Sequence, residues 1–459
     1  MDERTIIELS ELDQIMPRLY IRWLLCFRLS QASPSKDTII ETLQTGIEST
    51  LEALPILRGA VVPKPSDPSR LEVHVPRKTS KFGPRVQHRE EFFPTYDILE
   101  RAEFPVSLLP DEILTPPDID SKPVFEMMAT FIRGGLLLCI KCHHAVTDGA
   151  GLGLIVKLLA RNCLESSSPI ASPELNRAPS TDRSLLPQAT DEFDDATNIG
   201  FEVVDPTPKP DATPTREYAS MIHHTFKFSP DALKTLKGLC TIDSRVISTQ
   251  DALTSLLYGA VSYARAARFT RESTDHRTLP SVLGIAVNAR GRIPDAPAYA
   301  GNATLYAAFS HPMRLPVGEI PSDSLQDTTL LAERLGLPSL ASQSRAAITA
   351  VTHGSLVATI AAAAAQRDAS RLQPAFSDFY QGTDFFITSG ADFPVFEQEW
   401  WTGGIVDALR IPLKGQWDGS SAVLATKDRD AGLDVLLGMR EDDMALVKGL
   451  LFAFGARVV

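Results

Sequence analysis

The sequence predicts an α/β protein that is large enough for two domains. Short apolar runs, such as residues 136–140 and 282–288, are typical of buried strands. Longer segments, such as residues 37–54 and 252–268, carry apolar residues at helical spacing. The chain has 459 residues, of which 44% are hydrophobic, so each domain can bury a sizeable core.

A long stretch of different composition divides the chain. Between residues 166 and 215, serine, proline, aspartate and threonine dominate and the hydrophobic periodicity vanishes. This composition is typical of a surface connection. We therefore expect an N-terminal domain over residues 1–190, a crossover linker over residues 191–215 and a C-terminal domain over residues 216–459.

Spacing and chain breakers set the expected elements of the N-terminal part. The helix over residues 37–54 has apolar side chains spaced by three and four, and Pro55 ends it. Residues 124–132 and 136–141 flank a two-glycine turn and are expected to form a hairpin. Further strands are expected over residues 19–29 and 56–62.

Capping signals mark the helices of the C-terminal part. Residues 248–251 (STQD) resemble a capping box, with aspartate in place of glutamate, at the start of the helix over residues 252–268. Pro230 is expected in the first turn of another helix. Further helices are expected over residues 347–366 and 441–454, and strands over residues 218–228, 282–288, 385–388, 421–425 and 433–439.

The most distinctive stretch is CHHAVTDG, residues 142–149, which contains the pattern HHxxxDG. The buried strand over residues 136–140 precedes it, and a glycine-rich turn after Gly149 leads into a helix. The end of a buried strand is a rigid position for a catalytic base. Gly149 is expected to need a backbone conformation that a Cβ atom would forbid.

The same stretch could also be structural or bind a metal. In a structural role, the histidine rings would be hydrogen-bonded and Asp148 would cap the helix. A metal site would need a third ligand, and the other histidine pair, His223 and His224, lies in an alternating, strand-like segment. The combination of buried strand, paired histidines, Asp-Gly and helix favours catalysis over both, and no metal is expected.

Charge and cysteine content narrow the class of protein. The net charge of −12 argues against a nucleic-acid partner and means that an anionic ligand needs a local basic cluster. The five cysteines are odd in number and scattered, and Cys139 and Cys142 should point to opposite faces of a strand. The N-terminus does not fit a signal peptide, and no apolar run approaches membrane-spanning length. We expect a cytoplasmic monomer without membrane partners.

The histidines and the aspartate suit acyl transfer. A neutral histidine can take a proton from an alcohol or amine as it attacks an acyl donor, and the resulting oxyanion needs a donor nearby. His144 is the candidate base, because it begins the HxxxD pattern. Asp148 either steers the base or pairs with an arginine, since an unpaired buried charge is costly. Arg290 is the first candidate partner and Arg292 the second, because both follow a buried strand.

Segments along nearly the whole chain match the pattern of one enzyme family. The pattern HxxxDG over residues 144–149 matches without departure. The other segments are LSELD over 9–13, LPILRG over 54–59, STQDAL over 248–253, VNARGR over 287–292 and YAGN over 299–302. Together they resemble the BAHD acyltransferases, and more closely the fungal branch that includes trichothecene 3-O-acetyltransferase.

One stretch departs from that family. Residues 394–404, PVFEQEWWTGG, keep only the frame of the usual DFGWG motif. In the family this loop is mainly architectural and lies away from the chemistry, so the change concerns local geometry. Upstream, Ser389 and Gly390 stand where the family has Ser-Trp, which removes a ring that would line the acceptor site.

The resemblance implies a fold and a reaction. The fold would be two chloramphenicol-acetyltransferase-like α/β domains, with mixed sheets flanked by helices and an active-site channel at their interface. The reaction would be direct transfer of an acyl group, acetyl by default, from acyl-CoA to a hydroxyl of a secondary metabolite. His144 would act as general base in a ternary complex of the enzyme, the CoA thioester and the acceptor. Acyl-CoA would be a co-substrate, and no permanently bound cofactor is implied.

The resemblance also implies roles for individual residues. His144 and Asp148 are the expected catalytic pair, although Asp148 is expected to act structurally through its arginine. Substrate binding is expected of His143, Gly149, Ser389 and Gly390, and structural support of Arg290, Arg292, Tyr299 and Asn302.

The donor site must offset the acidity of the chain. Free N–H groups and the helix dipole at a helix N-terminus favour an anion, so Ser248 and Thr249 are candidates for binding the phosphates of CoA. A Ser-Thr N-terminus that binds nothing is the plainer alternative. The next candidates for the phosphates are Arg265, Arg268 and Arg271.

Two rival functions are open. A nonribosomal-peptide condensation domain carries the same HHxxxDG and fold, and would form an amide or ester from carrier-protein thioesters. The YAGN and VNARGR segments favour the CoA-dependent family, and this chain contains no carrier domain. A repurposed scaffold, for example one that shapes a cyclisation pocket, is the second rival, and the intact His144 argues against it.

Overall fold

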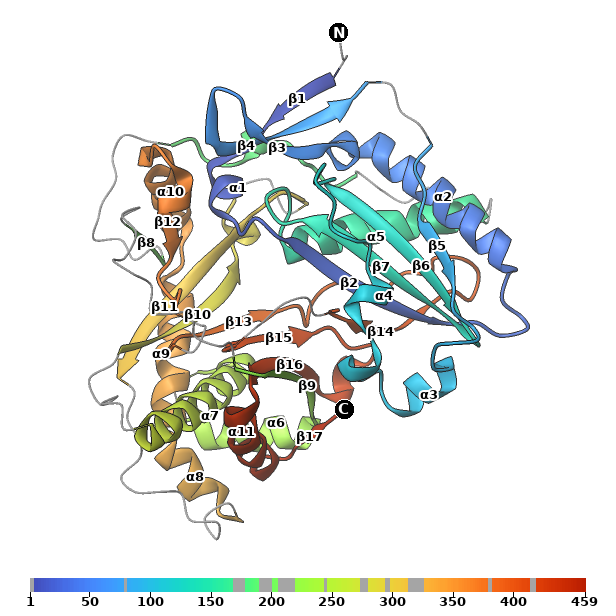
Figure 1. Ribbon diagram of the computed structural model, residues 1–459. Helices are drawn as coiled ribbons and strands as arrows, with labels where there is room; N and C mark the ends of the chain where they lie inside the picture. The colour runs from blue at the N-terminus through green and yellow to red at the C-terminus, as the bar shows by residue number, and fades with distance from the viewer. Residues whose placement is uncertain are drawn as a thin grey trace.

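Two large β-sheets, each covered by helices, form the body of the computed structural model (Figure 1). The structure describes residues 4–77, 81–167, 178–189, 200–204, 219–242, 246–272, 280–293, 298–312, 326–378, 382–412 and 418–459. The predicted linker therefore lies outside the described residues, except for residues 200–204.

The helices and strands of the first part of the chain end at the helix that follows the HHxxxDG pattern. The helices are α1 (Glu11–Ile15), α2 (Lys36–Ala53), α3 (Tyr96–Arg101), α4 (Asp111–Leu114) and α5 (Gly149–Ser167). The strands are β1 (Arg4–Glu8), β2 (Tyr20–Arg28), β3 (Ala60–Lys64), β4 (Asp67–Pro76), β5 (Arg85–His88), β6 (Phe125–Ile132) and β7 (Gly135–His143).

The second part of the chain contains the longer helices. They are α6 (Pro230–Cys240), α7 (Thr249–Arg271), α8 (Thr328–Arg334), α9 (Leu337–Ala350), α10 (His353–Ala365) and α11 (Glu441–Ala453). The strands are β8 (Phe201–Val203), β9 (Met221–Phe228), β10 (Pro280–Asn288), β11 (Thr304–Pro312), β12 (Leu372–Pro374), β13 (Phe385–Ser389), β14 (Val406–Arg410), β15 (Ser420–Leu424), β16 (Leu433–Arg440) and β17 (Ala456–Val458).

The first large sheet carries the HHxxxDG pattern at the end of its central strand. Its strand order is β14-β2-β7-β6-β5, and β7 pairs antiparallel with β2 and β6. Leu138, Ile140 and Cys142 share one hydrophobic cluster with the side chains of α2 and α5, which lie side by side on that face (Figure 1). Cys139 belongs to the cluster on the opposite face. The expectation that Cys139 and Cys142 point to opposite faces is confirmed.

The hairpin of β6 and β7 is also confirmed. Gly134, in its turn, has a φ of +81°, which a residue with a side chain rarely adopts. Every residue of both strands is buried, so the sequence shows continuous apolar runs instead of alternation.

The second large sheet is mixed and has the order β11-β10-β13-β15-β16-β9-β17. β13 pairs parallel with both β10 and β15, and the other pairs are antiparallel. Helices α6, α7 and α11 lie together against this sheet in Figure 1. Buried side chains of α7 and α11 share the largest hydrophobic cluster with β10, β13 and β16.

One strand of the second part completes the first sheet. β14 pairs antiparallel with β2, from Val406 opposite Phe27 to Arg410 opposite Leu24. Small sheets flank the two large ones, in the orders β1-β4-β3 and β12-β8. The short strand β8 lies in the predicted linker, and it joins β12 from the second part of the chain.

Two expected elements were wrong in detail. The single helix over residues 347–366 is interrupted, because the side chain of Thr352 caps the N-terminus of α10 and the chain bends by 73° between α9 and α10. The strand over residues 56–62 begins late, because Pro55 starts a short 3₁₀ turn and β3 follows it.

Within the described part of the chain, no single helix has the length and apolar composition to cross a membrane. Only the bent pair of α9 and α10 passes such a test jointly.

Candidate active site

The HHxxxDG stretch is pinned where β7 leaves the sheet. His143 is the last residue of β7, and its N–H donates to the Val124 carbonyl at 2.9 Å. The N–H of His144 donates to the Leu19 carbonyl at 2.8 Å. Neighbouring segments thus hold the backbone of both histidines from two sides, as a rigid mount for a catalytic group requires.

His144 is the partly exposed histidine of the pair. Its carbonyl accepts a hydrogen bond of 2.8 Å from Asn302 Nδ2, and its Nδ1 is buried without a hydrogen-bond partner among the described residues. Burial lowers the pKa of His144 below its ordinary value, and Asp148, Asn302 and Asp13 partly offset this. The imidazole is therefore neutral at neutral pH, which is the form that can accept a proton.

His143 is more deeply placed, with 2% of its surface exposed. The N–H of Ala145 donates to His143 Nδ1 at 3.2 Å, and the ring lies edge-on against Tyr20 with centroids 5.0 Å apart. Burial lowers the pKa of His143 to about 4, and the nearby positive charges of Lys122, Arg18 and Lys141 act in the same direction. His143 holds the turn in these contacts, and its substrate-binding role stays a prediction.

Asp148 is a buried carboxylate that accepts hydrogen bonds from several donors. Arg290 donates to both oxygens, with Nη2 2.8 Å from Oδ1 and Nη1 3.1 Å from Oδ2. The other donors are Gly151 N–H, Ala303 N–H and Thr304 Oγ1, at 2.8, 2.8 and 3.0 Å. Burial alone would raise the pKa of Asp148, but Arg290 and the N–H donors outweigh it and lower the pKa.

Arg290 is the arginine that pairs with Asp148. Its Nε donates to the Tyr299 carbonyl and its Nη2 to the Gly301 carbonyl, both at 2.6 Å. Arg292 does not take part, because its Nε donates to the Val351 carbonyl at 2.6 Å. The ion pair expected from the sequence is present with its first candidate, and Arg292 supports the start of α10 instead.

Residues 299–304 bring the two large sheets together at the HHxxxDG turn. Thr147 Oγ1 donates to the Ala300 carbonyl at 2.6 Å. A Cβ atom on Gly151 would lie 2.4 Å from the same carbonyl oxygen, so α5 can approach this backbone only with glycine there. Tyr299 is fully buried in the same segment. Tyr299 and Asn302 both lie at the junction, where the Tyr299 carbonyl accepts from Arg290 and the Asn302 side chain donates to the His144 carbonyl. Their support of the site stays a prediction.

The reason expected from the sequence for a glycine at position 149, a backbone conformation that forbids a Cβ atom, was wrong. Its φ is not in the left-handed region, so a Cβ atom is not forbidden by the backbone. A Cβ atom there would instead lie 3.0 Å from Cζ of Phe393. A side chain at this position would press on the aromatic ring, which would have to shift by a few tenths of an ångström.

Phe393 lies at the site although no sequence pattern predicted it. A Cβ atom on Gly390 would lie 2.6 Å from the ring of Phe393, which also stacks on Trp23 with centroids 5.1 Å apart. The ring thus occupies the space over Gly390, where the related family has a larger side chain. Ser389 lies beside it on the surface, with Oγ 3.4 Å from the side-chain oxygen of Gln250. Substrate binding by Ser389 and Gly390 stays a prediction.

Two tryptophans of the altered DFGWG-like stretch belong to the core. Trp400 and Trp401 are buried at 0% and 1% exposure and lie against Phe27 of β2. These rings anchor the segment that leads to β14.

The N-terminus of α7 is occupied by its own carboxylate. Ser248 Oγ accepts from the Asp251 N–H at 3.1 Å, and Asp251 Oδ2 accepts from the Ser248 N–H at 2.6 Å. Arg345 Nε donates to the same oxygen at 2.7 Å. A phosphate bound through Ser248 and Thr249 would therefore meet a buried negative charge, which Arg345 balances.

Two of the arginines that were the next candidates for binding the CoA phosphates are engaged in buried ion pairs. Arg265 is fully buried and lies 3.3 Å from Asp418, and Arg268 is 3.0 Å from Asp443. Both hold the helix to its surroundings, so neither is available to the phosphates of CoA. Arg271, in the last turn of α7, is exposed.

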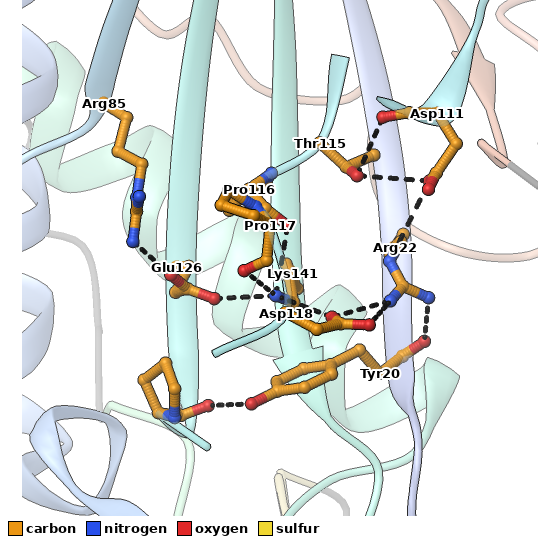
Figure 2. A network of polar contacts seen from close by, with 11 residues as sticks. Tyr20, Arg22, Arg85, Asp111, Thr115, Pro116, Pro117, Asp118, Glu126 and Lys141 are labelled. Carbon is orange, nitrogen blue, oxygen red and sulfur yellow. Dashed lines mark hydrogen bonds and ion pairs between the residues drawn. The ribbon is translucent and has the colours of Figure 1, made fainter. Parts of the chain in front are cut away.

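A second polar assembly, here called the Lys141 network, surrounds the side chain of Lys141 on β7 (Figure 2). Lys141 and His143 are two positions apart in this strand, so their side chains lie on the same face. Its members are Lys141, Glu126, Asp118, Arg22 and Asp111. Lys141 is fully buried, with Nζ 2.8 Å from Glu126 and 3.0 Å from Asp118, and it donates to the carbonyls of the proline pair at residues 116–117. Its Nζ also lies 4.2 Å from the centroid of the Tyr20 ring, the ring that touches His143.

All five cysteines are free and buried. Among the residues that the structure describes, no group of three or more His, Cys, Asp or Glu side chains is arranged to hold a metal ion.

Comparison with known proteins supports one family. The family model of the trichothecene 3-O-acetyltransferase-like N-terminal domain matches residues 19–163. An eremophilane O-acetyltransferase of Penicillium rubens is 27% identical over 95% of this chain and 94% of its own. A trichothecene 3-O-acetyltransferase of Saccharomyces cerevisiae is 28% identical over 62% of each chain.

A solved structure shows the same fold. The crystal structure of F. graminearum TRI101, complexed with coenzyme A and T-2 mycotoxin, superposes with a TM-score of 0.77 over 96% of each chain, at 21% identity. The predicted fold class is confirmed by this likeness.

Proposed function

We propose that this chain, which resembles trichothecene 3-O-acetyltransferase, is a BAHD-type acyltransferase that acetylates a hydroxyl of a secondary metabolite with acetyl-CoA. The observation that carries the proposal is the placement of His144, which is neutral, partly exposed and held at the end of a buried strand. The rival functions, a condensation enzyme and a repurposed scaffold, are not favoured, because the similar full-length relative is named an O-acetyltransferase.

His144 acts as the general base in the proposed mechanism. Its neutral imidazole takes the proton of the acceptor hydroxyl while that oxygen attacks the thioester carbonyl. The tetrahedral intermediate carries its negative charge on the former carbonyl oxygen, which needs a hydrogen-bond donor. When the intermediate collapses, the C–S bond breaks and the CoA thiolate takes the proton from His144. The ester and CoA leave, and His144 is neutral again.

Asp148 fixes the turn that carries the base. Its close contacts are with Arg290, Thr304 and backbone N–H groups, so its carboxylate is engaged in holding the junction. It also favours the protonated state of His144 through its charge, which stabilises the imidazolium that forms during the reaction.

We further propose a division into domains over residues 1–190 and 216–459, joined by a linker over residues 191–215, with the substrates meeting where the domains touch. The contacts of residues 299–304 with the HHxxxDG turn support this site, because they join the ends of β7 and β10. The acceptor contacts proposed for His143, Gly149, Ser389 and Gly390 belong to it, and Phe393 is added to them because its ring touches both glycine positions.

The proposed acyl donor is acetyl-CoA, and the crystal structure of F. graminearum TRI101 contains coenzyme A. Ser248 and Thr249 remain the proposed phosphate contacts, with Arg345 as the cation beside them. Replacing both hydroxyl residues by alanine and measuring CoA affinity at several salt concentrations tests this. Unchanged affinity and salt dependence in the folded variant would place the phosphates elsewhere.

Incubating the protein with acetyl-CoA and a panel of alcohols, and following release of the CoA thiol, tests the function. We expect thiol release that depends on the alcohol and yields its acetate ester. His144→Ala should lower turnover by about 10²–10⁴-fold, the usual range for loss of a general base. His353→Ala, at the exposed histidine that begins α10, is the control and should leave turnover unchanged. Near-normal turnover in folded His144→Ala would refute the role of His144.

The proposal includes a cytoplasmic monomer that uses no nucleic-acid or membrane partner. Size-exclusion chromatography with light scattering tests the monomer, for which a mass near 50.1 kDa is expected.

A further inference from the structure

Asp13 is a buried carboxylate that the mechanism above does not use. It lies in the short helix α1, far from the HHxxxDG stretch in sequence, and 0% of its surface is exposed. Its Oδ2 accepts the N–H of Ser10 at 2.9 Å, which completes the capping box of α1. A helix cap alone does not require a fully buried charge, so the other partners of Asp13 decide its role.

Two of those partners are donors from distant segments. Asn302 Nδ2 lies 2.7 Å from Asp13 Oδ1, and Arg183 Nε lies 3.0 Å from Asp13 Oδ2. Asn302 belongs to the segment that contacts Asp148, and Arg183 to a short 3₁₀ turn after the α5 region. One carboxylate thus orients an amide and a guanidinium at the same time.

Each of these donors also binds one carbonyl of the HHxxxDG turn. Asn302 Nδ2 donates to the His144 carbonyl at 2.8 Å, and Arg183 Nη2 donates to the Val146 carbonyl at 2.9 Å. The two carbonyls flank Ala145, between the proposed base and Asp148. The backbone of the turn is therefore fastened at two points that both lead back to Asp13, in addition to the fastening by Asp148 itself.

We propose that Asp13 is a positioning residue for the base, acting through Asn302 and Arg183 on the backbone on either side of Ala145. This inference rests on the proposed function of His144. It adds a second anchor of the turn, independent of the ion pair between Asp148 and Arg290.

The charge of Asp13 gives the proposal a measurable signature. Asp13 is one of the groups that raise the pKa of His144 against the larger effect of burial. In Asp13→Asn that contribution is lost, and the new NH₂ group faces the donor of either Asn302 or Arg183. The turn then loses alignment, and the pKa of His144 falls further below its ordinary value.

The test compares Asp13→Asn with Glu11→Gln. Glu11 lies on the same helix and pairs with Arg70 near the surface, so its variant removes an ion pair of α1 without touching the turn. Both variants are examined by thermal unfolding, by steady-state kinetics and by a histidine side-chain NMR titration, with His144→Gln to assign the His144 signal. The titration reports the pKa of His144 whether or not acyl transfer is observed.

We expect Asp13→Asn to lower kcat about tenfold and to change KM less than twofold. In the pH profile of kcat, the fall in activity on the acid side should move to lower pH, and the NMR titration of His144 should move in the same direction. Glu11→Gln should change none of these. Equal behaviour of the two variants would overturn the inference while leaving the proposed function intact. Wild-type protein that transfers no acetyl group would refute the function, and the titration would then decide the inference by itself.

Arg183→Lys is the second variant, and it decides the matter if Asp13→Asn does not fold. Lysine keeps the positive charge beside Asp13 but cannot also reach the Val146 carbonyl with a fixed fork. We expect kcat to fall about fivefold with the acid limb of the pH profile unchanged. An unchanged kcat in folded Arg183→Lys would overturn the inference.

Discussion

Two ionic assemblies lie near the end of β7, and they hold different parts of the molecule. The first, the junction cluster, consists of Asp148, Arg290 and the backbone of residues 299–304. Its two charged members are 142 positions apart in the sequence, and they follow strands of different sheets, β7 and β10. The second is the Lys141 network, whose members all lie between residues 22 and 141 (Figure 2).

The difference between the two assemblies shows that the sequence motifs here coincide with the residues that hold the proposed base. Both assemblies contain a buried charged side chain, Asp148 in one and Lys141 in the other, but only the junction cluster fixes the segment that carries the proposed base. Its members therefore appear in recognisable patterns, HxxxDG and VNARGR. Lys141 secures the residues 116–118 against the sheet, and it appears in the sequence only as one charged residue at the end of an apolar strand.

Breaking the junction cluster should have the largest effect. Arg290→Met leaves Asp148 buried without its cation, and removal of one partner of a buried ion pair costs about 3–5 kcal/mol. We expect the free energy of unfolding, measured in urea, to fall by about this amount. We also expect kcat to fall. Arg292→Met, at an arginine that donates to backbone carbonyls, is the control and should cost far less. Equal losses in the two variants would contradict the assignment of the pair to Arg290.

The pH dependence of stability tests His143, which lies in the sequence between Lys141 of one assembly and Asp148 of the other. The pKa of His143 is lowered to about 4 from 6.5, so its protonation favours the unfolded chain. Its contribution is fully present above pH 6.5 and is lost as the pH falls toward 4, and it amounts to about 3 kcal/mol at about 1.4 kcal/mol per pKa unit.

The difference in unfolding free energy between wild type and His143→Gln, measured from pH 7.5 to pH 4, isolates this contribution. We expect the wild type to lose more stability than the variant over that interval. Parallel curves would show that His143 titrates normally, and that neither burial nor the neighbouring charges lower its pKa.

Breaking the Lys141 network should have the smallest effect. In Lys141→Met, Glu126 keeps Arg85 at 3.0 Å and Asp118 keeps Arg22 at 3.1 Å, so the loss should be about 1–3 kcal/mol. The double variant Lys141→Met with Glu126→Gln should recover part of the loss, because it removes the charge left behind. The acid limb of the pH profile should not move, in contrast to Asp13→Asn. A shift of that limb would mean that the network acts on the base as well.

The sequence predicted the elements that carry the base. The strand before His143, the helix after Gly149 and the strand before Arg290 are confirmed, because continuous apolar runs and cap residues are local signals. The pairing of Asp148 with an arginine followed from the cost of a buried charge. The buried strand that precedes them then narrowed the partner to two neighbouring arginines, Arg290 and Arg292.

The rest of the site depends on contacts that no local pattern encodes. Asp13 and Asn302 are 289 positions apart, and their hydrogen bond exists only because the two sheets meet at the turn. Phe393 has no motif of its own, and only the packed structure shows its ring over Gly149 and Gly390. A burial pattern can place a residue inside the protein, but it does not say which distant residue it touches.

The position of β14 at the edge of the first sheet has a consequence for biosynthesis. A ribosome completes β2, β7 and β6 long before it reaches Val406, so the backbone of β2 is left without its neighbour on that side during most of translation. An unpaired strand edge is a template for association with other chains. The nascent chain therefore has to protect this edge until residues 406–410 emerge, and the first sheet is finished only then.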